Sequence, residues 1–159
     1  MLTDHNVLER TLVDVETRPM AYGETVTDMG DGDDATAYTA WHSCPAQAVI
    51  DWPKGRDEDP RYLSARTPRY KLVPNRELFS ALDLAADKHG IGLTPTSARY
   101  HRGRTKAVFA LDGEEFTVPG DKSPSTPTFI IGNDYKGGSS IVGEGGIFRL
   151  VCTNGMTIG

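Results

Sequence analysis

Residues 75–90, NRELFSALDLAADKHG, carry the strongest structural signal in this chain. Their apolar side chains recur at the three- and four-residue spacing of one helix face, and charged residues fall between them. These apolar positions are Leu78, Phe79, Leu82, Ala85 and Ala86. Asn75 belongs to the residue types that cap a helix start, and Gly90 suits the left-handed residue that closes a helix. The segment therefore predicts an amphipathic helix over 76–89.

The apolar period changes to two on the C-terminal side of this helix, which is typical of β-strands. Strands are expected over 97–102 and 105–111, then a hairpin turn at Asp112-Gly113 and a return strand at 115–118. On the N-terminal side, residues 70–73 predict a short strand.

Three further strands are predicted beyond the hairpin, a buried one at 129–131, a short one at 141–142 and a buried one at 147–152. The glycines of 143–146 indicate a turn between the last two. The predicted fold class is α+β, an antiparallel β-meander packed with at least one amphipathic helix at about 76–89.

The length of 159 residues indicates a single domain, because one hydrophobic core serves a chain of this size. We expect an acidic, loop-rich N-terminal section over 1–60 and a β-rich section over 61–159. The first section predicts a short helix and a strand that Pro19 ends, then a turn-rich acidic loop over 23–34. A calcium loop is not expected there, because the closing position would hold Thr39 where a Glu is required.

The net charge of −5 hides an asymmetry between these sections. Residues 1–60 sum to −9 and residues 61–159 to +4. Such a split favours a basic surface for an anionic partner, while acidic loops that solvate one end are the alternative.

The sequence lacks the motifs of several functional classes. It has no nucleophile elbow, no His-Glu-x-x-His and no phosphate loop, and Glu114 and Glu115 point to opposite strand faces. We therefore predict no catalytic residue, no cofactor and, since paired Cys or His units are missing, no metal site. No apolar run reaches the ~18 residues of a membrane span. Cys44 and Cys152 form no framework, which favours reduced thiols and the cytoplasm.

A basic cluster lies in the predicted hairpin between 97 and 111. On an unbulged strand, Arg102, Arg104 and Lys106 would share one face and hold phosphates, while Tyr100 would stack on a base. An exposed hairpin tip with solubilising charges is the alternative. The candidate nucleic-acid-binding residues are Arg99, Tyr100, Arg102, Arg104, Lys106 and Lys136.

Two polar residue types near the C-terminus have structural interpretations. Arg149 lies in an apolar strand and would pair with an acid such as Asp134 or Glu144, or else reach a ligand. Asn133 and Asn154 are expected to cap turns through their side chains.

The run 131–159, IGNDYKGGSSIVGEGGIFRLVCTNGMTIG, resembles the phage- and plasmid-like domain-of-unknown-function family nine-three-two. The likeness extends over about 62–159, and it departs from the family where Lys136 replaces a frequent acid. It implies a mobile-element setting and a longer helical C-terminal part, so that this chain would be a fragment. The matching motif residues are Asn133, Gly138, Ser139, Arg149, Cys152 and Asn154.

Two functions follow as hypotheses. The first is a mobile-element DNA accessory protein that binds single-stranded nucleic acid, self-associates and anneals strands as an oligomer. The second is a non-enzymatic regulator or inhibitor that binds another protein, because an acidic N-terminal section repels nucleic acid and imitates its charge.

Overall fold

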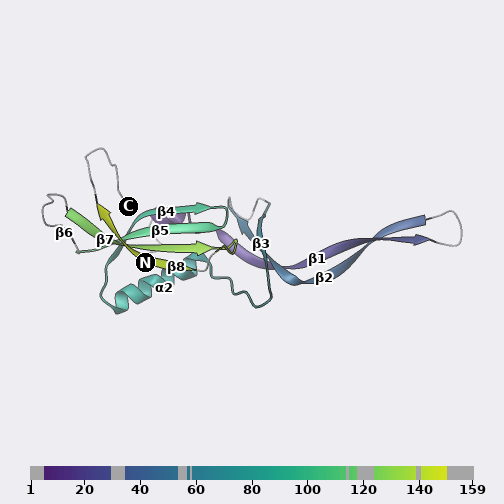
Figure 1. The fold of residues 1–159 in the computed structure, drawn as a ribbon, viewed down its shortest axis with the longest axis horizontal. Helices are drawn as coiled ribbons and strands as arrows, with labels where there is room; N and C mark the ends of the chain where they lie inside the picture. The colour runs from purple at the N-terminus through teal and green to yellow at the C-terminus, as the bar shows by residue number, and fades with distance from the viewer. Residues whose placement is uncertain are drawn as a thin grey trace.

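Two antiparallel sheets and one long helix make up the fold (Figure 1). This computed structural model describes residues 6–29, 35–53, 57, 59–113, 115–117, 124–138 and 141–149. The elements are α1 (Asn6–Glu9), β1 (Asp14–Met29), β2 (Ala35–Trp52), β3 (Arg61–Arg66), α2 (Asn75–Lys88), β4 (Leu93–His101), β5 (Arg104–Leu111), β6 (Phe116–Thr117), β7 (Pro124–Asp134) and β8 (Val142–Arg149).

The main sheet has the order β4-β5-β7-β6, and β8 pairs with β7 on the side opposite β5. All of its pairings are antiparallel. The α+β prediction holds in its coarse form, since the described chain is mainly antiparallel β-structure with a small helical part. The strand order is less regular than a meander, because β5 pairs with β7 and the short β6 pairs only with the start of β7.

Helix α2 covers one face of the main sheet, and this interface is the principal core. Phe79 of α2 is fully buried against Phe109 of β5, with the ring centroids 6.2 Å apart in an edge-to-face arrangement. Leu8 of α1, Ala107 and Ile131 complete the buried cluster. Burial of such aromatic and aliphatic side chains stabilises the fold by about 1.5–3 kcal/mol each.

The predicted helix is confirmed to within one residue at each end. Gly90 has φ +66°, and the amides of Gly90 and Ile91 donate to the carbonyls of Asp87 and Ala86, which is a Schellman closure. The prediction for Asn75 is wrong, because Pro74 occupies the capping position and makes no side-chain cap. Asn75 instead begins the helix with its side chain buried.

The N-terminal section is dominated by a long two-stranded hairpin of β1 and β2. Its outer part, residues 20–29 and 35–44, is called the arm below, and it extends away from the main sheet (Figure 1). The loop predicted over 23–34 is therefore wrong for 23–29, while 30–34 lie outside the described residues. The β-branched run Thr25–Thr27 favours a strand, and the Asp and Gly residues around it obscured this signal.

Pro19 does not end β1 as predicted. It lies within the strand at a register shift, where Pro19 pairs with Gln47 and the next residue pairs with Cys44. The skipped residues on β2 include Pro45. A bulge tolerates prolines because it leaves amide positions outside the regular ladder.

Strand β8 differs from the predicted turn and strand, because residues 143–146 continue the ladder with β7. A Cβ on Gly143 would lie 3.0 Å from the Phe129 ring, and one on Gly146 would lie 2.9 Å from the Thr128 hydroxyl. These glycines therefore make room for side chains of β7. Ile147, predicted to be buried, is 59% exposed, and residues 150–152 lie outside the described residues.

The arm sheet, β1-β2-β3, joins the main sheet through a second core. Val49 and Tyr135 are fully buried there, with Val15 and Leu63 around them. Asp51 of β2 is also fully buried, and its carboxylate accepts two hydrogen bonds from Arg61, at 3.0 and 2.7 Å, and one from the Tyr100 hydroxyl. The contact between Asp51 and Tyr100 links β2 to β4 and so fixes the two sheets together.

Candidate nucleic-acid interface

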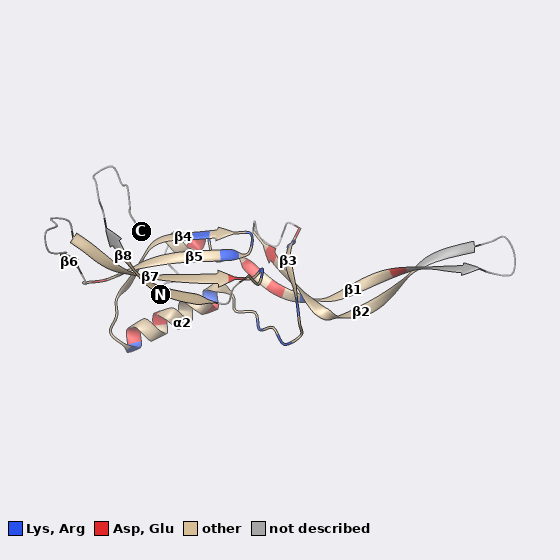
Figure 2. Ribbon diagram, in the orientation of Figure 1, with Lys and Arg blue, Asp and Glu red and all other residues tan. Residues whose placement is uncertain are grey.

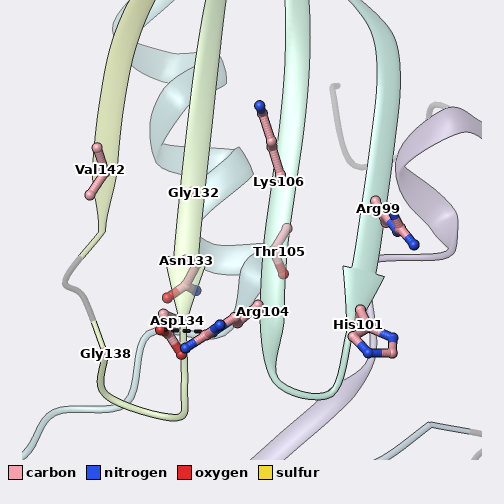
Figure 3. Close-up of a pocket in the computed structure, with 10 residues that line it drawn as sticks. All are labelled: Arg99, His101, Arg104, Thr105, Lys106, Gly132, Asn133, Asp134, Gly138 and Val142. Atoms are coloured by element: carbon pink, nitrogen blue, oxygen red, sulfur yellow. Dashed lines mark hydrogen bonds and ion pairs between the residues drawn. The ribbon is translucent and has the colours of Figure 1, made fainter.

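The face of the main sheet opposite α2 carries a hollow of about 600 Å³ (Figure 3). Strand alternation produces it, because Thr105, Ala107 and Phe109 are buried on one face of β5 while Arg104 and Lys106 are exposed on the other. The lining residues are Arg99, His101, Arg104, Thr105, Lys106, Gly132, Asn133, Asp134, Gly138 and Val142.

Basic residues lie directly opposite one another across β4 and β5. Arg99 pairs in register with Lys106, and His101 pairs with Arg104. Arg99 and Lys106 are like charges at opposed positions, which destabilise a strand pair, so the sheet gains nothing from this pairing. Within the described part of the chain, neither Arg99 nor Lys106 forms an ion pair. The arrangement is therefore typical of a surface that binds an anion.

One acid, Asp134, lies in the hollow and is already engaged. Arg104 Nε donates to its Oδ2 at 3.2 Å, and the Lys136 amide donates to its Oδ1 at 2.8 Å. Its side chain is 7% exposed, whereas that of Arg104 is 64% exposed. Asp134 thus orients Arg104 and shapes the turn after β7, while the guanidinium of Arg104 still faces solvent.

The prediction that Arg102, Arg104 and Lys106 share one strand face is wrong for Arg102. Arg102 lies in the β4–β5 turn with φ +45°, next to Gly103. A Cβ on Gly103 would lie 3.2 Å from Lys136 Cγ, so the stem of Lys136 lies against this turn. Arg102 and Lys136 therefore add positive charge at the β4–β5 turn. Figure 2 shows Lys and Arg positions in blue at this end of β4 and β5.

Tyr100 is not a stacking platform, contrary to the prediction. It alternates with Arg99 and His101, and its hydroxyl donates to the buried Asp51 on the other side of β4. Burial is the main cause that raises the pKa of Tyr100, and the hydrogen bond to Asp51 adds to it. Its role in this structure is to join the two sheets.

A buried polar network supports the hollow from beneath, and the sequence interpretation missed it. Asn75 Nδ2 donates to the Thr11 carbonyl at 2.6 Å and to the Thr105 hydroxyl at 2.7 Å. Asn75 Oδ1 accepts from Asn133 Nδ2 and from the Tyr135 hydroxyl, both at 3.0 Å. Asn133 is thus an interior link between β7 and α2, and its expected role as a turn cap is wrong.

A second hollow of about 500 Å³ adjoins the first at Asn133, Asp134 and Gly138. Arg66 and Lys71 line it, and the Arg66 guanidinium lies over the Tyr70 ring at 5.1 Å. Arg66 Nε is buried without a hydrogen-bond partner among the described residues. The positively charged surface therefore extends past the turn at 135–138. The basic residues at 66, 69 and 71 are the sequence signal that could have indicated this extension.

The remaining motif residues are placed only in part. Gly138 is exposed and lines both hollows. Arg149 ends β8 opposite Ser125, and its side chain is outside the description, so neither Asp134 nor Glu144 is assigned to it. Ser139, Cys152 and Asn154 lie outside the described residues.

The described residues contain no cluster of three His, Cys, Asp or Glu side chains placed to hold a metal ion. In the same part of the chain, every helix is too short or too polar to cross a membrane.

The fold and the hollow define a class of small, mainly antiparallel β-proteins with a helix on one sheet face and a cationic surface on the other. A family model described as Domain of unknown function (DUF932) matches residues 62–159. The chain belongs to this family, as its C-terminal motifs predicted. No curated protein and no solved structure matches the chain.

Proposed function

We propose that this chain is a nucleic-acid accessory protein that holds a single strand in the hollow on the open face of the main sheet. The opposed pair of Arg99 and Lys106, with Arg104 beside it in the hollow, carries the proposal. A phosphate backbone relieves the repulsion within such pairs and supplies most of the affinity of nonspecific binding.

The shape of the hollow favours single strands over duplexes. Gly132 and Val142 line the hollow without adding charge. The basic side chains of Arg99, Arg104 and Lys106 come from the neighbouring strands β4 and β5 (Figure 3). Unpaired bases contact apolar and guanidinium surfaces through their flat faces, whereas a duplex hides these faces in its stack. The resemblance of residues 131–159 to a phage- and plasmid-like family implies a mobile-element setting, so we extend the proposal to mobile-element DNA and to annealing if several copies assemble.

Fluorescence anisotropy of labelled oligonucleotides tests this proposal. We expect single strands to bind more tightly than duplexes, with affinity that falls as salt rises. Arg99→Glu with Lys106→Glu should weaken single-strand binding on the order of tenfold or more. Arg76→Glu with Lys88→Glu is the control, since it changes the charge equally on exposed positions of α2, across the sheet from the hollow. An equal loss of single-strand affinity in both variants would contradict the assignment of the hollow as the binding site.

A protein-binding regulator is the second candidate, and the arm favours it. The arm contains two acids, Glu24 and Asp28, and no Lys or Arg, and three more acids lie between its strands in the sequence. Such an arm repels nucleic acid and suits a basic protein surface. Absence of oligonucleotide binding at low salt, together with capture of one specific partner, would favour this function over the first.

A further inference from the structure

The arm is a two-stranded ribbon with no third strand among the described residues. Strand β3 pairs with β2 only from Gln47 to Asp51, so the pairs from Met20 to Met29 stand alone. At ~3.3 Å per residue this part of β1 reaches about 30 Å. A lone two-stranded ribbon is marginally stable in water, and it gains stability when it packs on another surface.

Both faces of the arm expose large aromatic side chains. Trp41 is 73% exposed and Tyr22 is 55% exposed. The Tyr22 ring stacks on His42 with centroids 5.1 Å apart, and Glu24 Oε2 lies 3.4 Å from His42 Nε2. One face of the arm therefore presents an aromatic pair next to a carboxylate, which is a combination suited to contact with Arg and Lys.

The charges of the arm and of the hollow are complementary. The formal charges of the arm are those of Glu24 and Asp28, both negative, and Glu24 is 64% exposed. Arg99, Arg104 and Lys106 present positive charge in the hollow. Two arms would repel each other, whereas an arm and a hollow attract.

We propose that the arm of one copy binds in the hollow of a second copy, through the face that carries Tyr22 and Glu24. Within one chain the arm extends away from the main sheet, so a copy does not fill its own hollow (Figure 1). The contact joins two different surfaces, and such head-to-tail contacts build rings or filaments. This inference shares the hollow with the proposed function but does not depend on nucleic acid.

Sedimentation velocity of nuclease-treated protein, with no nucleic acid present, tests the contact. We expect association at low salt that dissociates at high salt. Glu24→Lys with Asp28→Lys should weaken association on the order of tenfold or more, and so should Arg99→Glu with Lys106→Glu. Glu77→Lys with Asp87→Lys is the arm's control, because it makes the same charge change at exposed positions of α2.

Mixing provides the decisive step, because the two charge-reversed variants are complementary to each other. An equimolar mixture of the arm variant and the hollow variant should regain association. Wild-type protein that stays monomeric at low salt, or association that the arm variant leaves intact, overturns the proposal. The arm variant keeps its hollow, so its binding of single strands tests the proposed function separately.

Discussion

The side-chain amide of Asn133 in β7 donates a 3.0 Å hydrogen bond to the side-chain oxygen of Asn75, the first residue of α2. Both residues are buried, at 7% and 1% exposure. The bond ties the helix on one face of the main sheet to the strand whose next residue, Asp134, lines the hollow on the other. A polar core contact thus fixes the surface that we propose as the binding site.

Asn75→Ala should lower the free energy of unfolding by about 2–4 kcal/mol, because it leaves several buried polar groups without partners. These include the Thr11 carbonyl and the Thr105 hydroxyl. Urea unfolding measures the change. Asn6→Ala, at an exposed position of α1, should change stability by less than about 0.5 kcal/mol. Similar values for both variants would contradict the network.

Tyr100→Phe tests the structural role of the Tyr100 hydroxyl. Removal of the hydroxyl takes one donor from the buried Asp51, and we expect a loss of about 1.5–3 kcal/mol in unfolding free energy. Phenylalanine keeps an aromatic ring, and the side chain points away from the hollow, so the oligonucleotide affinity of the folded variant should be unchanged. Unchanged stability would contradict the role of the hydroxyl in joining the two sheets.

Alkaline pH should destabilise the protein through Tyr135, which is buried, and Tyr100, which is partly buried. Burial raises the pKa of both Tyr100 and Tyr135 in the folded state. Above the unfolded value of about 10, the unfolded chain has lost protons that the folded chain retains, so stability falls as pH rises. Each tyrosine contributes a slope of about −1.4 kcal/mol per pH unit.

Urea unfolding between about pH 8 and about pH 11 measures this slope. Tyr135→Phe removes one of the two groups and should make the alkaline slope shallower by about 1.4 kcal/mol per pH unit. Tyr22→Phe is the control, because Tyr22 is exposed on the arm. A slope that Tyr135→Phe leaves unchanged would rule out this origin.

Gly137→Ala should disrupt the turn between the two hollows. Gly137 has φ +87°, and a Cβ there would lie 1.7 Å from an Arg66 guanidinium nitrogen. Backbone strain at this positive φ and displacement of the Arg66 side chain should together lower the free energy of unfolding by more than about 1 kcal/mol. Gly145→Ala is the matched control, since its Cβ would meet nothing within 4 Å, and it should change stability by less than about 0.5 kcal/mol. Equal effects would show that the turn tolerates a side chain.

Local patterns were enough to predict the helix and the hairpin beside it. The 3.6-residue period with Gly90 predicted α2, and the period of two predicted β4 and β5. The same patterns failed for β1 and β8, because Gly and Asp residues that usually mark turns lie within these strands. In β8, glycines are required because side chains of β7 occupy the space that a Cβ would fill. The sequence of β8 alone does not contain this information.

The sequence predicted which basic residues form the candidate site, but it predicted their arrangement only in part. Arg104 and Lys106 lie on one strand face, as their spacing indicated, and the register of β4 with β5 brings Arg99 to the same hollow. Tyr100 was misassigned because its partner, Asp51, lies 49 residues away in sequence. Asn133 was misassigned for the same reason, since its partner Asn75 is 58 residues away. Long-range hydrogen bonds decide the roles of such polar residues, and sequence spacing does not show them.

The salt dependence of single-strand binding tests the central claim most directly. Each phosphate contact contributes a slope of about −0.7 to the plot of log affinity against log salt concentration. Arg99→Glu with Lys106→Glu should therefore make the slope shallower by about 1.4 or more, while Arg76→Glu with Lys88→Glu leaves it unchanged. A wild-type slope near zero, or equal slopes in wild type and the Arg99 and Lys106 variant, would contradict binding of nucleic acid in this hollow.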